Sequence, residues 1–247
     1  MIETARSWSG RSWQMPGRVS LFATCLVDQL FPQVGIATAD VLERLGYSVT
    51  LPPAQTCCGQ PAFNSGFRDE ARKAALAFFR AMEGSEYIVI PSGSCAAMVT
   101  RHYAELVPEH PLVARTYEFT RFLIDVVGTE KLKARFPHTV TYHDSCHSLR
   151  ELGLRDEPRR LLAAVDGLTL VETDIAGECC GFGGTFSVKF PEVSGAMART
   201  KLQAMLKTGA THVVSADSSC LMQLAGVIAR DHLPLQTVHL AEVLASR

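Results

Sequence analysis

The chain has 247 residues, of which 47% are hydrophobic and 20% charged, a composition typical of a globular protein with one large domain or two small ones. Its 24 basic and 25 acidic side chains nearly cancel, which excludes the basic surface of a nucleic-acid-binding protein or of a protein held at an anionic membrane. No apolar run reaches the roughly 18–20 residues that a membrane-spanning helix requires, so we expect neither a nucleic-acid partner nor a membrane span.

The first 17 residues, MIETARSWSGRSWQMPG, are rich in Arg and Ser and lack the apolar stretch of a secretory signal. They are typical of a disordered extension, or of a start assigned too early with Met15 as the true first residue; a transit peptide is the alternative. Without export, we expect a cytoplasmic protein in a reducing compartment. There, a cysteine pattern indicates metal binding or catalysis more often than disulfides.

Short β-rich runs predict strands at 19–24, 47–51 and 87–91, and again at 139–143, 168–172 and 212–216. The clearest helix runs from Asp69 to Met82, where apolar residues recur at a spacing of about 3.6 residues. The segment from Thr237 to Arg247 is expected to add a last strand and helix. Strands that alternate with helices predict an α/β fold in which a mostly parallel sheet is covered on both faces.

The cysteines divide the chain into two similar halves. They are Cys25, Cys57, Cys58 and Cys95, and again Cys146, Cys179, Cys180 and Cys220. Equivalent cysteines lie 121 (25 to 146), 122 (57 to 179) and 125 (95 to 220) residues apart, and none is left over. The flanks repeat as well, since EYIVIPSGSC parallels THVVSADSSC. We therefore predict two pseudo-symmetric Rossmann-like modules, at 18–125 and 126–247.

Every cysteine position lies at or just past the carboxyl end of a predicted strand, where ligand sites form in parallel sheets. Each module would thus bring four thiols together, a set that suits an iron–sulfur cluster or a tetrahedral zinc ion. The wide spacing excludes the compact ferredoxin run and the C-x₂-C zinc knuckle. Adjacent cysteines also fit tetrahedral zinc poorly. Eight buried structural cysteines are the alternative, which the duplicated spacing disfavours.

Glycines follow both Cys-Cys pairs: Gly59 and Gly181 directly, with Gly183 and Gly184 extending the second loop. Because glycine lets the backbone approach closely and adopt positive φ, these four are candidate cofactor-binding residues. The run GFGGTF lacks the last glycine of a dinucleotide-binding loop and predicts no nucleotide cofactor.

Two histidines, His143 and His147, flank Cys146 in the run YHDSCH. As candidate catalytic residues, they would act as proton donors or as hydrogen-bond partners of the metal site. The alternative is a structural histidine that anchors the strand-to-helix turn by bonding backbone carbonyls.

The segments TCCGQP and PSGSC, followed by HDSCH, ECCGFGGTFS and DSSC, resemble the duplicated cysteine-rich CCG domain. That domain occurs in heterodisulfide reductases, in the iron–sulfur subunits of glycolate oxidases and in anaerobic glycerol-3-phosphate dehydrogenases. LFATCLVDQLFPQVG and YHDSCHSLREL are most similar to the stand-alone members that act in lactate utilisation. The similarity runs from about residue 18 to the end of the sequence.

The resemblance implies an iron–sulfur electron-transfer subunit of an L-lactate-oxidising complex, acting with a ferredoxin-like iron–sulfur subunit and a third subunit as pyruvate forms. In the heterodisulfide reductase relatives, each motif ends in Cys-x-x-Cys and such motifs hold non-cubane [4Fe-4S] clusters. Here the first cysteine of that pair is Ser92 in one module and Asp217 in the other. The resemblance therefore implies one or two [4Fe-4S] clusters on four thiolates each, with Asp217 as a further oxygen ligand, and leaves room for zinc in one module.

Two other functions stay open. A thiol–disulfide oxidoreductase would cycle Cys57-Cys58 or Cys179-Cys180 as a vicinal disulfide, although the C-x-x-C signature of such enzymes is absent. A zinc-stapled module would instead assemble other subunits without redox chemistry. No flavin or nicotinamide motif is visible, so we expect an enzyme only in the sense of a subunit of an oxidoreductase complex. The motifs do not distinguish lactate from another 2-hydroxy acid.

Overall fold

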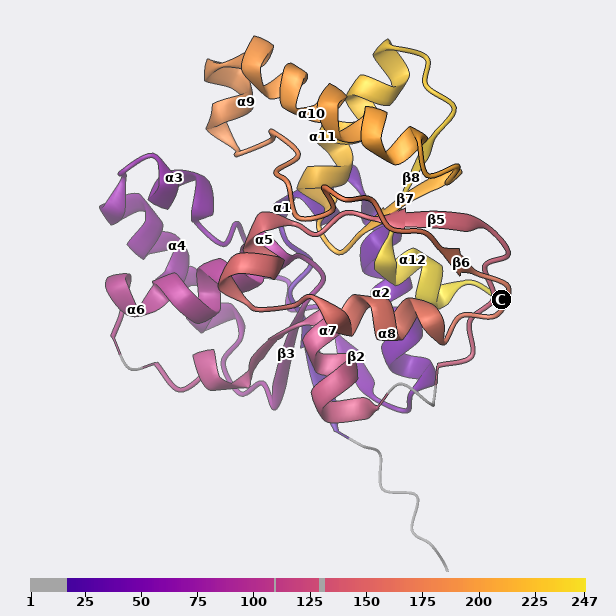
Figure 1. Ribbon diagram of the computed structural model, residues 1–247. Helices are drawn as coiled ribbons and strands as arrows, with labels where there is room; N and C mark the ends of the chain where they lie inside the picture. Colours follow the sequence, from indigo (N-terminus) through magenta and orange to yellow (C-terminus); the bar gives the residue numbers. More distant parts are fainter. Residues whose placement is uncertain (1–16, 109, 129–131) are drawn as a thin grey trace, which may run out of the picture.

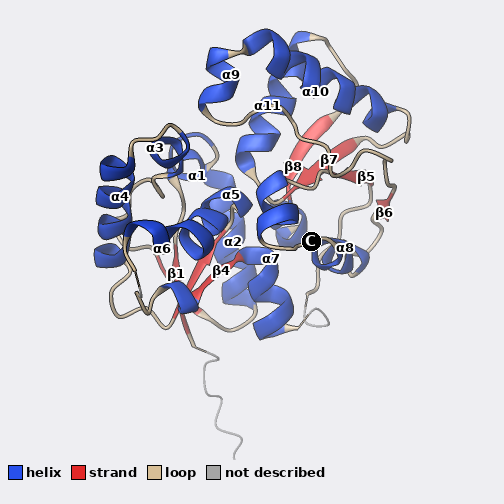
Figure 2. Ribbon diagram, turned by 60° about the vertical axis from the view of Figure 1, so that its left-hand side comes forward, coloured by secondary structure: helices blue, strands red, loops and turns tan. Residues whose placement is uncertain are grey.

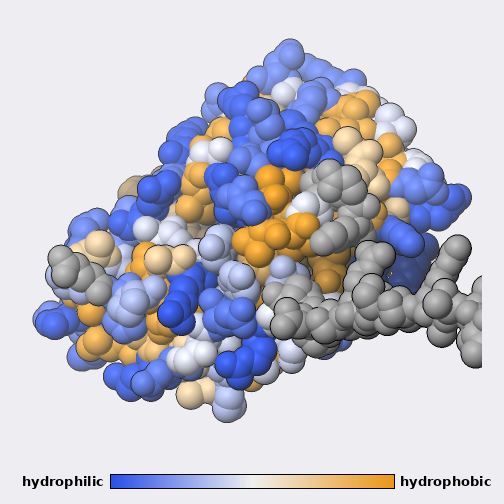
Figure 3. Space-filling view, turned by 90° about the horizontal axis from the view of Figure 1, so that it is seen from below, coloured by the Kyte–Doolittle hydropathy of each residue, from blue (hydrophilic) through white to orange (hydrophobic). Residues whose placement is uncertain are grey.

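A computed structural model describes residues 17–108, 110–128 and 132–247 (Figure 1). The extension expected at 1–17, with the alternative start at Met15, lies outside these residues apart from Gly17. None of the helices in the described ranges combines the length and the apolar character that a bilayer span needs. On the face seen from below, hydrophilic and hydrophobic side chains are interspersed (Figure 3).

The first half of the chain builds a four-stranded parallel sheet in the order β2-β1-β3-β4. Its strands are β1 (Arg18–Leu21), β2 (Ser48–Thr50), β3 (Tyr87–Ile90) and β4 (Thr116–Glu118). Its helices are α1 (Cys25–Leu30), α2 (Pro32–Arg44), α3 (Gln60–Asn64), α4 (Arg68–Ala81), α5 (Gly93–Ala97), α6 (Tyr103–Leu106) and α7 (Phe119–Phe122). A π-helical turn (Met98–His102) joins α5 to α6, a second (Leu123–Val127) extends α7, and a 3₁₀ turn (Val113–Arg115) precedes β4.

The second half repeats this arrangement in a parallel sheet of order β6-β5-β7-β8. Its strands are β5 (Thr139–Tyr142), β6 (Thr169–Leu170), β7 (His212–Ser215) and β8 (Gln236–His239). Its helices are α8 (Asp156–Ala163), α9 (Thr185–Lys189), α10 (Pro191–Leu206), α11 (Ser218–Arg230) and α12 (Leu240–Ala245), with a π-helical turn (His147–Glu151) after β5. The identical strand order confirms the predicted α/β fold of two pseudo-symmetric modules with parallel sheets (Figure 2).

Every strand expected from the sequence is present, and α4 matches the helix expected from Asp69 to Met82. The last strand and helix are also confirmed, as β8 and α12. Strand β4 was not predicted, because its three residues, Thr-Tyr-Glu, form no apolar run. The duplication carries the missing signal, since TYEFTRFL from Thr116 occupies the place that TVHLAEVL from Thr237 occupies in the second half.

Each sheet has one face of its own and one face shared with the other module. In β3, Val89 belongs to a central cluster while Ile88 and Ile90 pack on α4 and the helix that follows Cys95. In β7, Val214 points to the same central cluster and Val213 to α10 and α11. Since successive strand residues face opposite sides, the two sheets enclose one common core.

Helix α12 of the second repeat packs against α2 of the first repeat (Figure 1). Val41 and Leu42 of α2 lie in the central cluster with Leu240 and Leu244 of α12. The guanidinium of Arg44 donates to the Leu244 carbonyl at 2.8 Å. Each module therefore has its own cysteine motif and its own outer apolar cluster, but the two modules share the central cluster.

Candidate metal centre

All eight cysteines line one cavity of about 330 Å³, to which both modules contribute. The thiols come from the start of α1, the two Cys-Cys-Gly loops, α5, the end of the β5 loop and α11. His147, Gly183 and Gly184 also line this cavity, whereas His143, Asp217, Gly59 and Gly181 lie outside its lining. The fold therefore brings together, at the carboxyl ends of both sheets, eight cysteines that are spread over almost 200 residues of the sequence.

In the first quartet, the thiols meet in two pairs. The Cys25 Sγ donates to the Cys57 Sγ at 3.8 Å, and the Cys58 Sγ to the Cys95 Sγ at 3.1 Å. The hydroxyl of buried Tyr103 donates to the Cys58 carbonyl at 2.9 Å, which holds the Cys58–Gly59 peptide in place.

In the second quartet, the Sγ atoms of Cys180 and Cys220 and a ring nitrogen of His143 all lie within 4.8 Å of one another. All three side chains are buried. At the cavity wall, the Nδ1 of His147 lies 3.5 Å from the Cys146 Sγ, and its Nε2 is 3.6 Å from a carboxylate oxygen of Glu151. Of the two histidines predicted for the site, His143 is thus buried behind the thiols of Cys180 and Cys220, and His147 lies beside the thiol of Cys146.

One cysteine in each quartet favours the thiolate form. The hydrogen bond from Cys25 lowers the pKa of Cys57 to about 2, and the one from Cys146 lowers the pKa of Cys179 to about 2. The backbone N–H groups of Gly59 and Gly181 also donate to these two sulfurs, each at 3.4 Å. The same thiol–thiol bonds raise the pKa of Cys25 and Cys146. Because thiolates are the form that binds metal, Cys57 and Cys179 are ready as ligands.

The donor set fits a thiolate-bound metal centre. Soft sulfur ligands select zinc, copper(I) or iron–sulfur clusters, and all eight cysteines are free. The thiols approach one another without forming disulfides and open onto one cavity large enough to hold more than water.

Gly59 and Gly181 are needed for packing rather than for contact with the cavity. Their φ angles are +83° and +87°, and a Cβ at either position would collide with the following long helix. At Gly59 it would lie 2.9 Å from the Ala74 Cβ, and at Gly181 2.5 Å from the Ser194 carbonyl oxygen. These glycines bring each Cys-Cys-Gly loop against its helix, so that the N–H group can turn toward the sulfur.

Asp217 holds the two modules together. It is the N-cap of α11, and its Oδ1 accepts from the Ser219 backbone N–H at 3.1 Å. Its Oδ2 accepts from the Ser94 N–H of the first module at 2.7 Å and from the Ser92 hydroxyl at 3.5 Å. Ser92 is the corresponding N-cap of α5. The two residues that replace cysteine in the motif thus contact each other, and both carboxylate oxygens of Asp217 are engaged by protein donors.

His143 is fully buried, and neither ring nitrogen has a hydrogen-bond partner among the described residues. The expectation that it anchors the turn by bonding carbonyls is therefore not met by its ring. Burial, with nearby Lys201, lowers the pKa of His143 to about 3. The imidazole is neutral at physiological pH, which is the form that binds metal.

Lys201 was missed by the sequence analysis. Its Nζ, on the buried face of α10, donates to the carbonyls of Ile175 and Ala176 at 2.8 Å and of Glu178 at 2.7 Å. Burial lowers its pKa to about 8. These bonds fix the loop that leads into Cys179. The signal was a lysine placed among the apolar positions of a helix, where a charged side chain requires partners.

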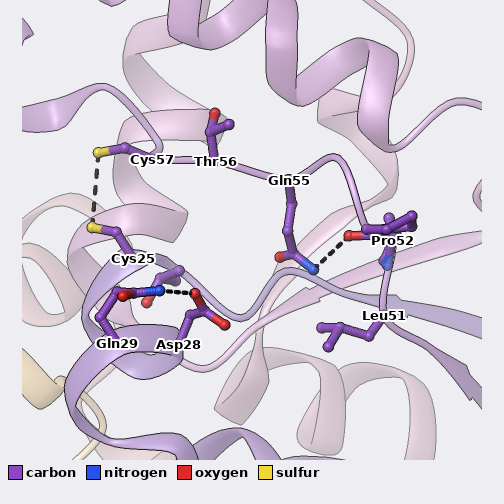
Figure 4. A pocket seen from close by; sticks show the side chains of 10 residues that line it. Cys25, Asp28, Gln29, Leu51, Pro52, Gln55, Thr56 and Cys57 are labelled. Atoms are coloured by element: carbon purple, nitrogen blue, oxygen red, sulfur yellow. Dashed lines mark hydrogen bonds between the residues drawn. The ribbon is translucent and has the colours of Figure 1, made fainter.

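Cys25 and Cys57 also line a second cavity of about 330 Å³, together with residues 51–53, 55 and 56 of the loop after β2 (Figure 4). Gln55 closes part of it, because its Oε1 accepts from the Ala23 N–H at 2.8 Å and its Nε2 donates to the Pro52 carbonyl at 3.0 Å. The first quartet therefore borders two cavities.

Comparison with known proteins agrees with the duplicated motifs. The CCG cysteine-rich domain family matches residues 19–100 and 140–225, once in each module. Lactate utilization protein A of Exiguobacterium sp. is 47% identical over 236 residues, which cover 92% of this chain and 96% of that protein. The proteins of the same name from Geobacillus kaustophilus and Oceanobacillus iheyensis are 46% and 44% identical, over 93% and 92% of this chain and 99% and 96% of their own lengths. The chain therefore belongs to the CCG cysteine-rich domain family and, within it, to the branch of lactate utilization protein A.

Proposed function

We propose that this chain is the iron–sulfur electron-transfer subunit of a system that oxidises L-lactate to pyruvate, with one cluster site in each module. The observation that carries the proposal is the gathering of all eight thiols around one cavity in two quartets. The relatives' name supports a role in lactate utilisation. The finer assignment, to electron transfer, rests on the donor set.

In this proposal the cysteines bind the clusters, and neighbouring backbone groups adjust the reduction potentials. Cys25, Cys57, Cys58 and Cys95 would hold one [4Fe-4S] cluster, and Cys146, Cys179, Cys180 and Cys220 the other. Such a cluster supplies one-electron redox chemistry at a potential set by burial and by hydrogen bonds to sulfur. The Gly59 and Gly181 N–H groups donate to cysteine sulfur in a way that would stabilise negative charge there.

Since the chain has no flavin or nicotinamide motif, the first acceptor of electrons from lactate belongs to another subunit. We propose a ferredoxin-like iron–sulfur subunit and a third subunit as partners, in the cytoplasm. The isolated chain is then expected to show little turnover of its own.

Iron, zinc and acid-labile sulfide per chain, measured on protein purified without oxygen, test the proposal. We expect about four or eight irons with matching sulfide, for one or two [4Fe-4S] sites. Cys58→Ser and Cys179→Ser should each remove about one module's share, while the untouched module serves as the internal control. Zinc without sulfide would contradict electron transfer and support a zinc-stapled assembly module.

A vicinal-dithiol oxidoreductase is the second candidate, favoured by one observation. Cys57 and Cys179 combine a lowered pKa with partial exposure, the properties of a reactive cysteine. Disulfide mapping at defined redox potentials decides between the two. A reversible Cys57-Cys58 or Cys179-Cys180 disulfide in metal-free, active protein would replace the cluster proposal.

A further inference from the structure

Residues around the thiols of one module correspond to residues around the thiols of the other, segment by segment. The buried positions of α4 and α10 correspond at a constant offset of 123 residues: Ala71, Ala75, Phe78, Phe79 and Met82 match Ser194, Ala198, Lys201, Leu202 and Met205. Phe22 and His143 correspond as well, since each lies three residues before the first cysteine of its quartet. Their N–H groups donate to equivalent strand carbonyls, Val89 at 2.9 Å and Val214 at 2.8 Å.

The corresponding residues next to the thiols differ in polarity between the two modules. In the first module, Phe22 and Phe78 form an edge-to-face pair with ring centroids 5.0 Å apart. In the second module, the same two positions hold His143 and Lys201. The two aromatic side chains of the first module are therefore replaced by two polar side chains in the second module.

The imidazole of His143 has no protein partner to explain its burial. Its side chain is fully buried, and both ring nitrogens are without a hydrogen bond within the described part of the chain. Lys201 does not fill this role, because its three ammonium protons are directed at three backbone carbonyls. A buried polar group without a partner is costly, so such a group calls for another explanation.

The environment of the ring supplies that explanation. A ring nitrogen lies within 4.8 Å of the sulfurs of both Cys180 and Cys220. Imidazole nitrogen and thiolate sulfur are the ligand types of zinc sites and of histidine-containing iron–sulfur centres. At this position the second module has a metal-binding donor, where the first module has the phenyl ring of Phe22.

We propose that His143 is a direct ligand of the metal centre in the second module, so that the two centres differ: four thiols in the first, four thiols and an imidazole in the second. The inference rests on the proposed metal binding of both quartets. It makes His143 a ligand, where the sequence had indicated a proton donor or a hydrogen-bond partner.

Pulsed EPR on the reduced full-length protein, grown with ¹⁴N- or ¹⁵N-labelled histidine, tests the proposal. We expect a strong nitrogen coupling that changes with the isotope, as a directly bound imidazole produces. The coupling should be lost in His143→Phe, which copies the first module, and in His143→Gln, which keeps a polar side chain of similar size. It should remain in His147→Phe, the matched control beside Cys146. If the metal is zinc, the imidazole scattering in the zinc-edge X-ray absorption spectrum replaces the coupling as the readout.

The outcomes separate this inference from the function on which it rests. Wild-type protein without bound metal would overturn both. Bound metal without an isotope-sensitive histidine signal would overturn the ligand assignment alone, and so would a signal that survives both His143 substitutions. Because the labelled wild type already decides whether any histidine is bound, the test holds even where one variant does not fold.

Discussion

Asp217 provides the sharpest test of how the two modules are joined. Asp217→Ala removes the N-cap of α11 and leaves the buried Ser94 N–H without its acceptor. Loss of a cap costs about 1 kcal/mol, and a buried unsatisfied N–H costs roughly 1–3 kcal/mol more. We therefore expect the free energy of unfolding to fall by about 2–4 kcal/mol, which for a chain of this size lowers the Tm by roughly 4–16 °C.

Urea unfolding and iron content, measured on the same samples, check this expectation. Asp217→Asn keeps one acceptor oxygen and should lose less stability than Asp217→Ala. Ser92→Ala removes the weaker cap of α5, at 3.4 Å from the Cys95 N–H, and the long 3.5 Å bond to Asp217, and should cost about 1 kcal/mol or less. Each variant should keep its metal. If Asp217→Ala retained wild-type stability but lost one module's iron, the carboxylate would be a ligand and the structural reasoning would fail.

Three further expectations follow from other parts of the fold. Lys201→Met should remove the ammonium donor that three carbonyls of the 175–178 loop share, two of which keep a backbone N–H donor. It should lower stability by about 1–3 kcal/mol and release metal from the second quartet first; unchanged metal content would contradict this role. Gly181→Ala should destabilise the protein more than Gly209→Ala in thermal unfolding. Both glycines have positive φ, but only the added Cβ at Gly181 would also lie 2.5 Å from a backbone oxygen. Equal losses of stability would argue against the close approach. Burial raises the pKa of Glu118 from 4.5 to about 7, so between these pH values the folded state binds a proton that the unfolded state has released. The contribution of Glu118 to the free energy of unfolding should therefore fall by up to roughly 3 kcal/mol as the pH rises from 4.5 to 7. Glu118→Gln should remove that slope from urea-unfolding free energies measured across this range, and a slope equal to the wild type's would refute the assignment.

The fold follows from the sequence where the information is local or repeated. Alternating β-rich runs and a 3.6-residue apolar stripe predict the strands and α4, and the cysteine offsets predict the duplication. A residue's environment is harder to predict where it depends on the other module. The partner of Asp217 is the Ser94 N–H, more than 120 residues away in the chain, and no local pattern specifies such a contact.

Burial was the other quantity that the sequence did not reveal. Lys201 occupies an apolar position of its helix, but the sequence does not show which groups surround it, and these are the carbonyls of the loop at 175–178. In the same way, the motif YHDSCH placed two histidines near Cys146 but did not distinguish the partly exposed His147 from the fully buried His143. Burial in both cases depends on residues far away in the chain, such as the loop at 175–178 for Lys201.

The packing of α12 on α2 has a consequence for how the protein is made. Helix α2 ends at Arg44, but the residues that cover it lie at 240–245, close to 200 residues later in synthesis. At about 5–20 residues per second, a ribosome takes roughly 10–40 s to bridge that interval. From the synthesis of Cys95 until α12 is made, the first repeat has all four of its thiols but a core that α12 does not yet cover. A chain cut between its repeats is thus expected to yield two pieces that each carry a full quartet and each lack part of the common core.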